Sequence, residues 1–93
     1  MEKNIMDTRR THLHTFYGTD TYANRESKVY LSYTVDKESG ETSVTKNHYE
    51  VDFIENGEVK ETREMITKEP DVVIHSEQYA EDAAENWVLG VIE

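Results

Sequence analysis

Histidines and carboxylates are the residues of this chain that could bind a metal or carry out acid–base chemistry. His12 and His14 are separated by one residue, and His48 and His75 lie further along the chain. On a strand, this spacing points the two imidazoles of His12 and His14 to the same face. A tetrahedral zinc site needs a third or fourth ligand as well, and the sequence does not show which residue would supply it. We therefore expect no metal site and no cofactor.

Catalytic motifs are absent from the sequence. There is no cysteine to act as a nucleophile, no G-x-S-x-G turn for a serine, and no H-E-x-x-H, EF-hand or phosphate-binding loop. The carboxylates are abundant, but a general acid needs a buried carboxyl with a raised pKa, and these are expected to face solvent. We expect a protein that is not an enzyme.

The charge balance points to a protein partner. The 93 residues include 10 Lys and Arg against 20 Asp and Glu, a net charge of −10, and the acidic excess lies in the second half of the chain. Such a surface repels nucleic acid and anionic lipid and attracts basic proteins. We expect a basic protein partner, no direct nucleic-acid binding and no membrane binding. Without an apolar run long enough for a membrane helix or a signal peptide, the expected location is cytoplasmic.

The densest acidic segment lies near the C-terminus, where a helix is predicted over residues 76–91. Ser76 is a good N-cap, and apolar residues including Trp87 recur at spacings of three and four. Glu77, Glu81 and Glu85 are spaced by four, so they form one row with Asp82 beside it, and we expect this row opposite the apolar face. Like charges at that spacing disfavour a helix by about 0.2–0.5 kcal/mol per pair.

A second acidic group is expected on the sheet. Glu50 and Asp52 are two residues apart on one strand, and a two-residue Asn56-Gly57 turn would place Asp52 opposite Glu61 and Glu50 opposite Arg63. Two interpretations stay open: the charge serves only solubility, or it forms a docking surface. The candidate partner-binding residues are Glu77, Glu81, Asp82, Glu85, Glu50, Asp52 and Glu61.

The elements that would position these residues form one domain over residues 1–93. Residues 1–11 are expected to be a loosely ordered arm, and residues 12–18 a short strand. Alternating apolar residues over 28–66, interrupted by turns at Gly40 and Asn56-Gly57, predict a β-meander. The predicted fold class is α+β: a three- to four-stranded antiparallel meander with the C-terminal helix packed on one face.

A resemblance adds to this interpretation. The segments "YLSYTV", "HYEVDFIENGEVKETREM" and "SEQYAEDAAENWVLG" together resemble small phage-encoded proteins, some of which are anti-CRISPR or anti-restriction inhibitors. The resemblance covers about residues 28–90 and implies an inhibitor that occupies a host protein, for instance its basic nucleic-acid-binding surface. The leading hypothesis is a non-enzymatic acidic protein-binding module. The alternative is a structural or self-assembling protein that forms a homodimer through a sheet edge or a Tyr-rich face.

Overall fold

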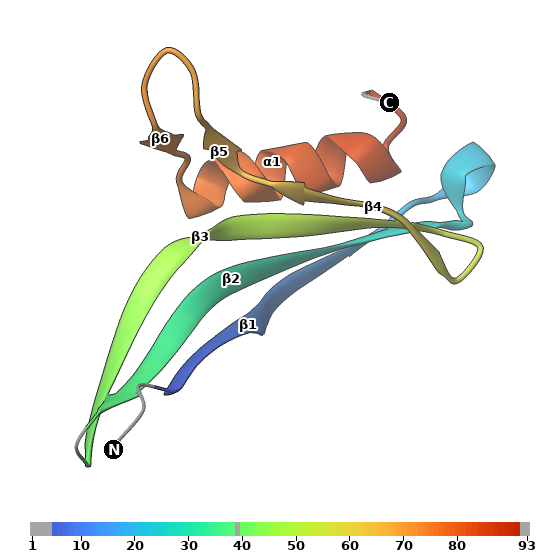
Figure 1. Cartoon of the computed structure of the whole chain (residues 1–93). Coiled ribbons are helices and arrows are strands. Elements are labelled where there is room, and N and C mark those ends of the chain that lie inside the picture. The colour runs from blue at the N-terminus through green and yellow to red at the C-terminus, as the bar shows by residue number, and fades with distance from the viewer. Residues whose placement is uncertain (1–4, 39, 92–93) are drawn as a thin grey trace.

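Four antiparallel strands pair in the order in which they follow along the chain (Figure 1). A computed structural model describes residues 5–38 and 40–91. The strands are β1 (Ile5–Tyr17), β2 (Arg25–Glu38), β3 (Glu41–Glu55) and β4 (Glu58–Glu64). A single turn of 3-10 helix, η1 (Asp20–Tyr22), connects β1 to β2. The two-stranded pair β5 (Ile66–Thr67) and β6 (Val73–Ile74) leads to the helix α1 (Glu77–Val88). The predicted α+β meander is confirmed.

The N-terminal segment differs from the sequence-based expectation. Residues 5–11, predicted as part of a loose arm, belong to β1 and pair with β2 from Ile5 opposite Lys37 to Thr11 opposite Leu31. Their backbone N–H and C=O groups find partners in the ladder, and threonines at 8 and 11 suit an extended backbone. The prediction for residues 1–4 lies outside the described residues. The sheet therefore starts much earlier than the predicted meander.

The turn predictions are confirmed by backbone dihedrals. Asn56 and Gly57 both have positive φ, 55° and 78°, as the predicted β3–β4 hairpin requires, and Gly40 has φ of 82° between β2 and β3. The register beyond the Asn56-Gly57 turn was predicted wrongly, because Lys60 is an extra residue that forms a β-bulge in β4.

The bulge at Lys60 changes which side chains face each other. Ile54 faces Val59 as predicted, but beyond the bulge Asp52 faces Thr62 and Glu50 faces Glu64. The predicted pairs of Asp52 with Glu61 and of Glu50 with Arg63 do not form.

The helix is capped by Ser76 as predicted, but it stops at Val88 and not at residue 91. The Ser76 Oγ accepts a hydrogen bond from the Tyr79 N–H at 3.2 Å. At the other end, the Gly90 N–H donates to the Trp87 carbonyl and the Val91 N–H donates to the Asn86 carbonyl, while Gly90 has φ of 76°. This is a Schellman motif, in which a glycine takes the left-handed conformation.

The core lies between α1 and the middle of the sheet. Trp87 is buried, as predicted, and its ring lies 5.2 Å from that of Phe53 between centroids. Close approach of helix and sheet is possible because Ala80 and Ala84 are small, and the Ser27 hydroxyl donates to the Ala84 carbonyl at 2.8 Å. The cluster is completed by Val29, Val51, Met65 and Val88.

The sheet is longer than the helix that covers it. The radius of gyration is 16.1 Å, against about 12 Å expected for a compact domain of this length. In Figure 1 the start of β1 and the hairpin end of β2 and β3 project beyond α1 and bend away from it. Extra residues at Leu13 in β1 and Asn47 in β3 form bulges near this bend, and bulges bend strands. We call residues 5–12, 32–38 and 40–48 the sheet arm.

Candidate protein-binding site

The helix carries the carboxylates that the sequence singled out, and we call Glu77, Glu81, Asp82 and Glu85 the acidic helix face. Glu77 and Glu81 do not lie opposite the apolar side, as was expected. Each precedes a buried alanine by three residues, so both lie on the flank of the helix above β1. There the His14 Nε2 is 2.8 Å from a Glu77 oxygen and 3.7 Å from a Glu81 oxygen.

Asp82 and Glu85 point away from the sheet and are exposed. The Gln78 side chain donates to Asp82 at 2.9 Å. Within residues 5–38 and 40–91, no lysine or arginine forms an ion pair with any member of the acidic helix face. Residues 65–91, which form the layer above the sheet, contain one lysine and six acidic residues. This layer is the least compensated part of the described chain.

A shallow hollow of about 290 Å³ lies on the helix beside these carboxylates. It is lined by Tyr79, Asp82, Ala83 and Asn86. Tyr79 is half-exposed, and its ring stacks on His75 with 4.0 Å between centroids. The hollow therefore combines an aromatic ring, a carboxylate and an amide, and this chemistry suits the side chain of a lysine or arginine.

Asp52 is not available to a partner, although the sequence predicted it as a docking residue. It is 3% exposed, and its two oxygens accept hydrogen bonds from Arg10 at 3.0 and 2.9 Å and from the Thr62 hydroxyl at 2.7 Å. Burial alone would raise the pKa of this carboxyl, but the hydrogen bonds from Arg10 and Thr62 and the charges of Arg10 and Lys28 outweigh it, so the pKa is lowered. Asp52 is a structural residue of the sheet.

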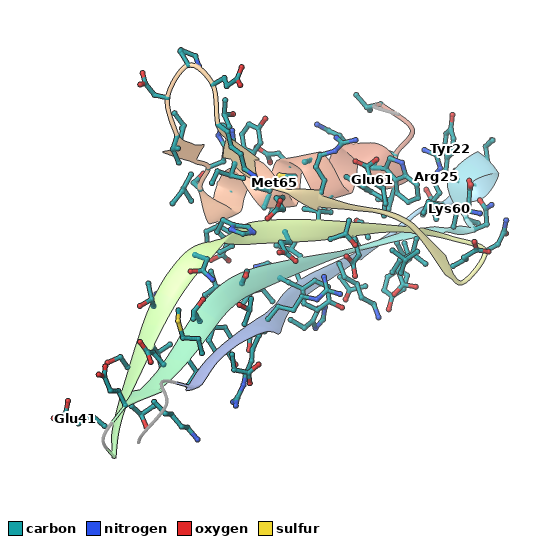
Figure 2. The ribbon with its side chains drawn as sticks, viewed as in Figure 1. Tyr22, Arg25, Glu41, Lys60, Glu61 and Met65 are labelled. Carbon is teal, nitrogen blue, oxygen red and sulfur yellow. The ribbon has the colours of Figure 1, made fainter. Side chains whose placement is uncertain are left out.

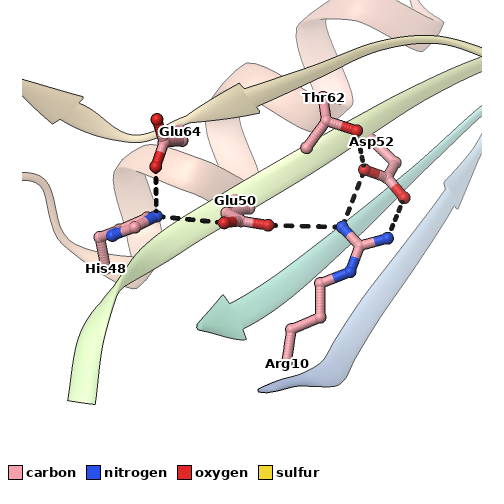
Figure 3. Close-up of polar contacts among 6 residues, drawn as sticks. All are labelled: Arg10, His48, Glu50, Asp52, Thr62 and Glu64. Carbon is pink, nitrogen blue, oxygen red and sulfur yellow. Dashed lines mark hydrogen bonds and ion pairs between the residues drawn. The ribbon is translucent and has the colours of Figure 1, made fainter. Parts of the chain in front are cut away.

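Glu50 belongs to the same network (Figure 3). One of its oxygens is 3.4 Å from Arg10, and the other is 3.1 Å from the His48 Nε2, which also lies 3.0 Å from Glu64. The network is carried on the sheet face opposite the helix, and the Arg10 guanidinium lies 4.0 Å above the Tyr30 ring. Glu50 is therefore shared between two basic groups of its own chain.

Glu61 is exposed but is also paired within the chain. Arg63 donates two hydrogen bonds to its carboxylate, at 2.9 and 3.1 Å, and this contact lowers the pKa of Glu61. The same guanidinium lies 4.9 Å from the Phe53 ring. Of the seven predicted docking residues, those on the sheet are all engaged by basic groups. Among the described residues, the one basic group that contacts the helix carboxylates is His14, which meets Glu77 and Glu81.

The predicted pairing of His12 and His14 on one face is wrong, because Leu13 is a bulge residue. His12 lies opposite Tyr30 and His14 opposite Val29, so the two imidazoles point to opposite faces of the sheet. The two tyrosines of β2 are divided between the faces of the sheet. Tyr30 and Tyr33 are three residues apart on β2 and point to opposite sides.

Arg25 holds the C-terminal end of the helix, a role the sequence did not indicate. Its guanidinium donates to the Trp87 carbonyl at 2.9 Å and lies within 4.6 Å of the Tyr22 and Trp87 ring centroids. Figure 2 shows Tyr22 and Arg25 together at this end of the molecule. A cation at a helix C-terminus is favourable, so Arg25 stabilises this end of the helix.

Comparison with known protein families, curated proteins and solved structures finds no match to this chain. Within the described ranges, no helix has the length and apolar character needed to cross a membrane.

Proposed function

We propose that this chain is a non-enzymatic protein-binding module that docks on a basic protein through the acidic helix face. The observation that carries the proposal is the contrast between the two layers. Sheet carboxylates are paired with arginines of the same chain, whereas Asp82 and Glu85 face solvent on a layer with one lysine and six acidic residues. Charges left without partners in the free protein are suited to pairing with a partner's charges.

The hollow beside Asp82 gives the docking surface a point of specificity. A partner's lysine or arginine entering it would meet the Asp82 carboxylate and the Tyr79 ring. If the partner covers the hollow, this contact is removed from water, and contacts buried in an interface contribute more to affinity than those at its rim. The surrounding glutamates would mainly speed association, and this contribution weakens in salt.

An inhibitor that covers a nucleic-acid-binding surface is the specific form of this function that we favour. Successive carboxylates four residues apart on a helix rise by about 6 Å, which approximates a sparse row of phosphates. The row is short, since only the helix contributes to it. The expected target is therefore a compact basic cleft and not a long duplex-binding channel.

Affinity capture from a host lysate at low and at high salt tests this function. We expect a basic protein that is retained at low salt, is released at high salt and is displaced by added nucleic acid. Retention that does not change with salt would contradict an electrostatic docking surface. If added nucleic acid does not displace the captured protein, the proposed inhibition of a nucleic-acid-binding surface is rejected, while the proposed binding to a basic protein is kept.

Self-assembly is a second candidate, and the sheet arm favours it. β1 is a 13-residue edge strand, and the arm exposes Met6 and Val44 beyond the cover of the helix. A hollow of about 300 Å³ on the arm is lined by Met6, Asp7, Arg9, Val35 and Lys37. Edge strands and exposed apolar side chains are sites of association between chains.

Light scattering after size exclusion separates the second candidate from the first. A dimer whose population rises with concentration, is insensitive to salt and is lost in Val44→Asp would support assembly through the arm. A monomer at every concentration would reject it.

A further inference from the structure

A second chemical feature of the helix lies on its flank, where three side chains from two elements converge. His14 of β1 faces Glu77 and Glu81 in the first two turns of α1, and one ligand atom of each lies within 4.8 Å of the other two. The His14 Nε2 is 2.8 Å from Glu77 and 3.7 Å from Glu81. All three side chains are partly exposed, so an ion can reach them from solvent.

The spacing of these atoms suits a small transition-metal ion. Zinc binds imidazole nitrogen and carboxylate oxygen at about 2.0–2.2 Å in tetrahedral geometry, so its ligand atoms lie about 3.4 Å apart. The distances from the His14 Nε2 to the oxygens of Glu77 and Glu81, 2.8 and 3.7 Å, fall on either side of that value. One nitrogen and two oxygen ligands favour zinc and similar divalent ions over calcium or magnesium, which prefer oxygen alone.

The three groups satisfy one another poorly without an ion. The His14 Nε2 carries at most one hydrogen, so it can donate to one glutamate well and not to both. The two glutamates are like charges at a spacing of four on a helix, which is unfavourable. No described lysine or arginine forms an ion pair with either of them. A divalent cation would neutralise both carboxylates at once.

We propose that His14, Glu77 and Glu81 form a binding site for one divalent transition-metal ion of the zinc type, with water completing its coordination. This departs from the sequence-based expectation that the chain has no metal site. The sequence does not reveal that these three side chains converge, because Glu77 and Glu81 lie more than 60 residues from His14. In addition, the bulge at Leu13 turns His14, but not His12, toward the helix. The bound ion would fasten the N-terminal half of the helix to the edge strand.

The chain contains a second histidine–glutamate cluster that serves as an internal control. His48, Glu50 and Glu64 also bring three ligand atoms within 4.8 Å of one another. There, however, Glu50 is already engaged by the Arg10 guanidinium at 3.4 Å, and this positive charge repels a second cation. We therefore assign the metal to the cluster on the helix flank and none to the cluster on the sheet.

Calorimetric titration of the untagged, chelator-treated chain with zinc chloride tests the site. We expect one zinc per chain, at least tenfold weaker binding in Glu81→Gln and in His14→Gln, and unchanged binding in the control Glu64→Gln. The His14 imidazole proton resonances should shift on zinc addition while those of His48 stay. Circular dichroism confirms that each variant is folded, and Glu81→Gln keeps the test decisive if His14→Gln does not fold. Absence of stoichiometric binding, or equal loss in Glu64→Gln, overturns the proposal.

Discussion

Arg10 and Asp52 are separated by 42 positions in the chain, yet they form a bidentate ion pair that spans strand β2 of the sheet. Arg10 lies on β1 and Asp52 on β3, so the side chains meet across β2. The pair ties the N-terminal edge strand to the centre of the sheet, and it removes from the surface a carboxylate that the sequence predicted as a docking residue.

Replacing Arg10 by alanine should destabilise the fold by about 1–3 kcal/mol, because Asp52 would stay buried with only Thr62 as a partner. Urea denaturation measures the change. The matched control is Arg9→Ala, which removes an exposed arginine whose ion pair with Asp7 is local, and its effect on stability should be much smaller because exposed ion pairs contribute little. Equal losses of unfolding free energy in the two variants would show that the Arg10–Asp52 pair stabilises the fold no more than an exposed local ion pair does.

The same pair makes stability depend on acid pH. Because the folded-state pKa of Asp52 is lowered, its contribution is fully present above the ordinary value of 3.8 and is lost as the pH falls through the lowered pKa. Asp52→Asn should therefore flatten the acid limb of the stability profile. Thermal melts between neutral pH and the acid limb measure this, with Glu58→Gln as an exposed control. If the acid limb keeps the same slope in Asp52→Asn, the Asp52 carboxylate is not the group that makes stability depend on acid pH.

Trp87→Ala should lower stability by about 3–5 kcal/mol, since the indole is buried against Phe53. Leu89, two residues further on, is half-exposed, and Leu89→Ala should cost little. The free energy of unfolding in denaturant compares the two. A small effect of Trp87→Ala would show that the helix contributes little to the core.

Gly90→Ala should also destabilise the chain, for two reasons that add. The residue has positive φ at the helix end, and an added Cβ would overlap the Tyr22 ring. Gly57 offers a control, because it has a similar φ but open space around it. Gly57→Ala should therefore be destabilised only by the strain of placing alanine at positive φ. The difference in melting temperature between the two alanine variants measures the contact with Tyr22.

Features encoded by neighbouring residues could be predicted from the sequence. Ser76 caps the helix, Asn56 and Gly57 form the hairpin turn, and the spacing of apolar residues places Trp87 in the core. Each of these depends on a few consecutive residues or on a simple period. For the same reason, the sequence was enough to predict that consecutive strands pair as neighbours and that the apolar side of the helix packs on the sheet.

Features that depend on contacts between distant segments could not be predicted in this way. Three bulges, at Leu13, Asn47 and Lys60, change which side chains face each other, and no local pattern announces them. Arg10 lies in a polar segment without obvious period, so its pairing with Asp52 depends on the register of β1. The acidic character of the helix was therefore readable from the sequence, but the division between paired sheet carboxylates and exposed helix carboxylates appears only in the folded chain.

The acidic helix face can be tested by reversing its two most exposed charges. We compare Asp82→Lys/Glu85→Lys with Glu41→Lys/Glu58→Lys, which makes the same change in net charge at exposed positions away from the helix; Figure 2 shows Glu41 at the tip of the sheet arm. The measurement is the dissociation constant for the basic protein captured at low salt. Docking through the helix predicts a loss of at least tenfold in the first variant and a much smaller change in the second. Equal losses in both variants, or no loss in the first, would contradict it.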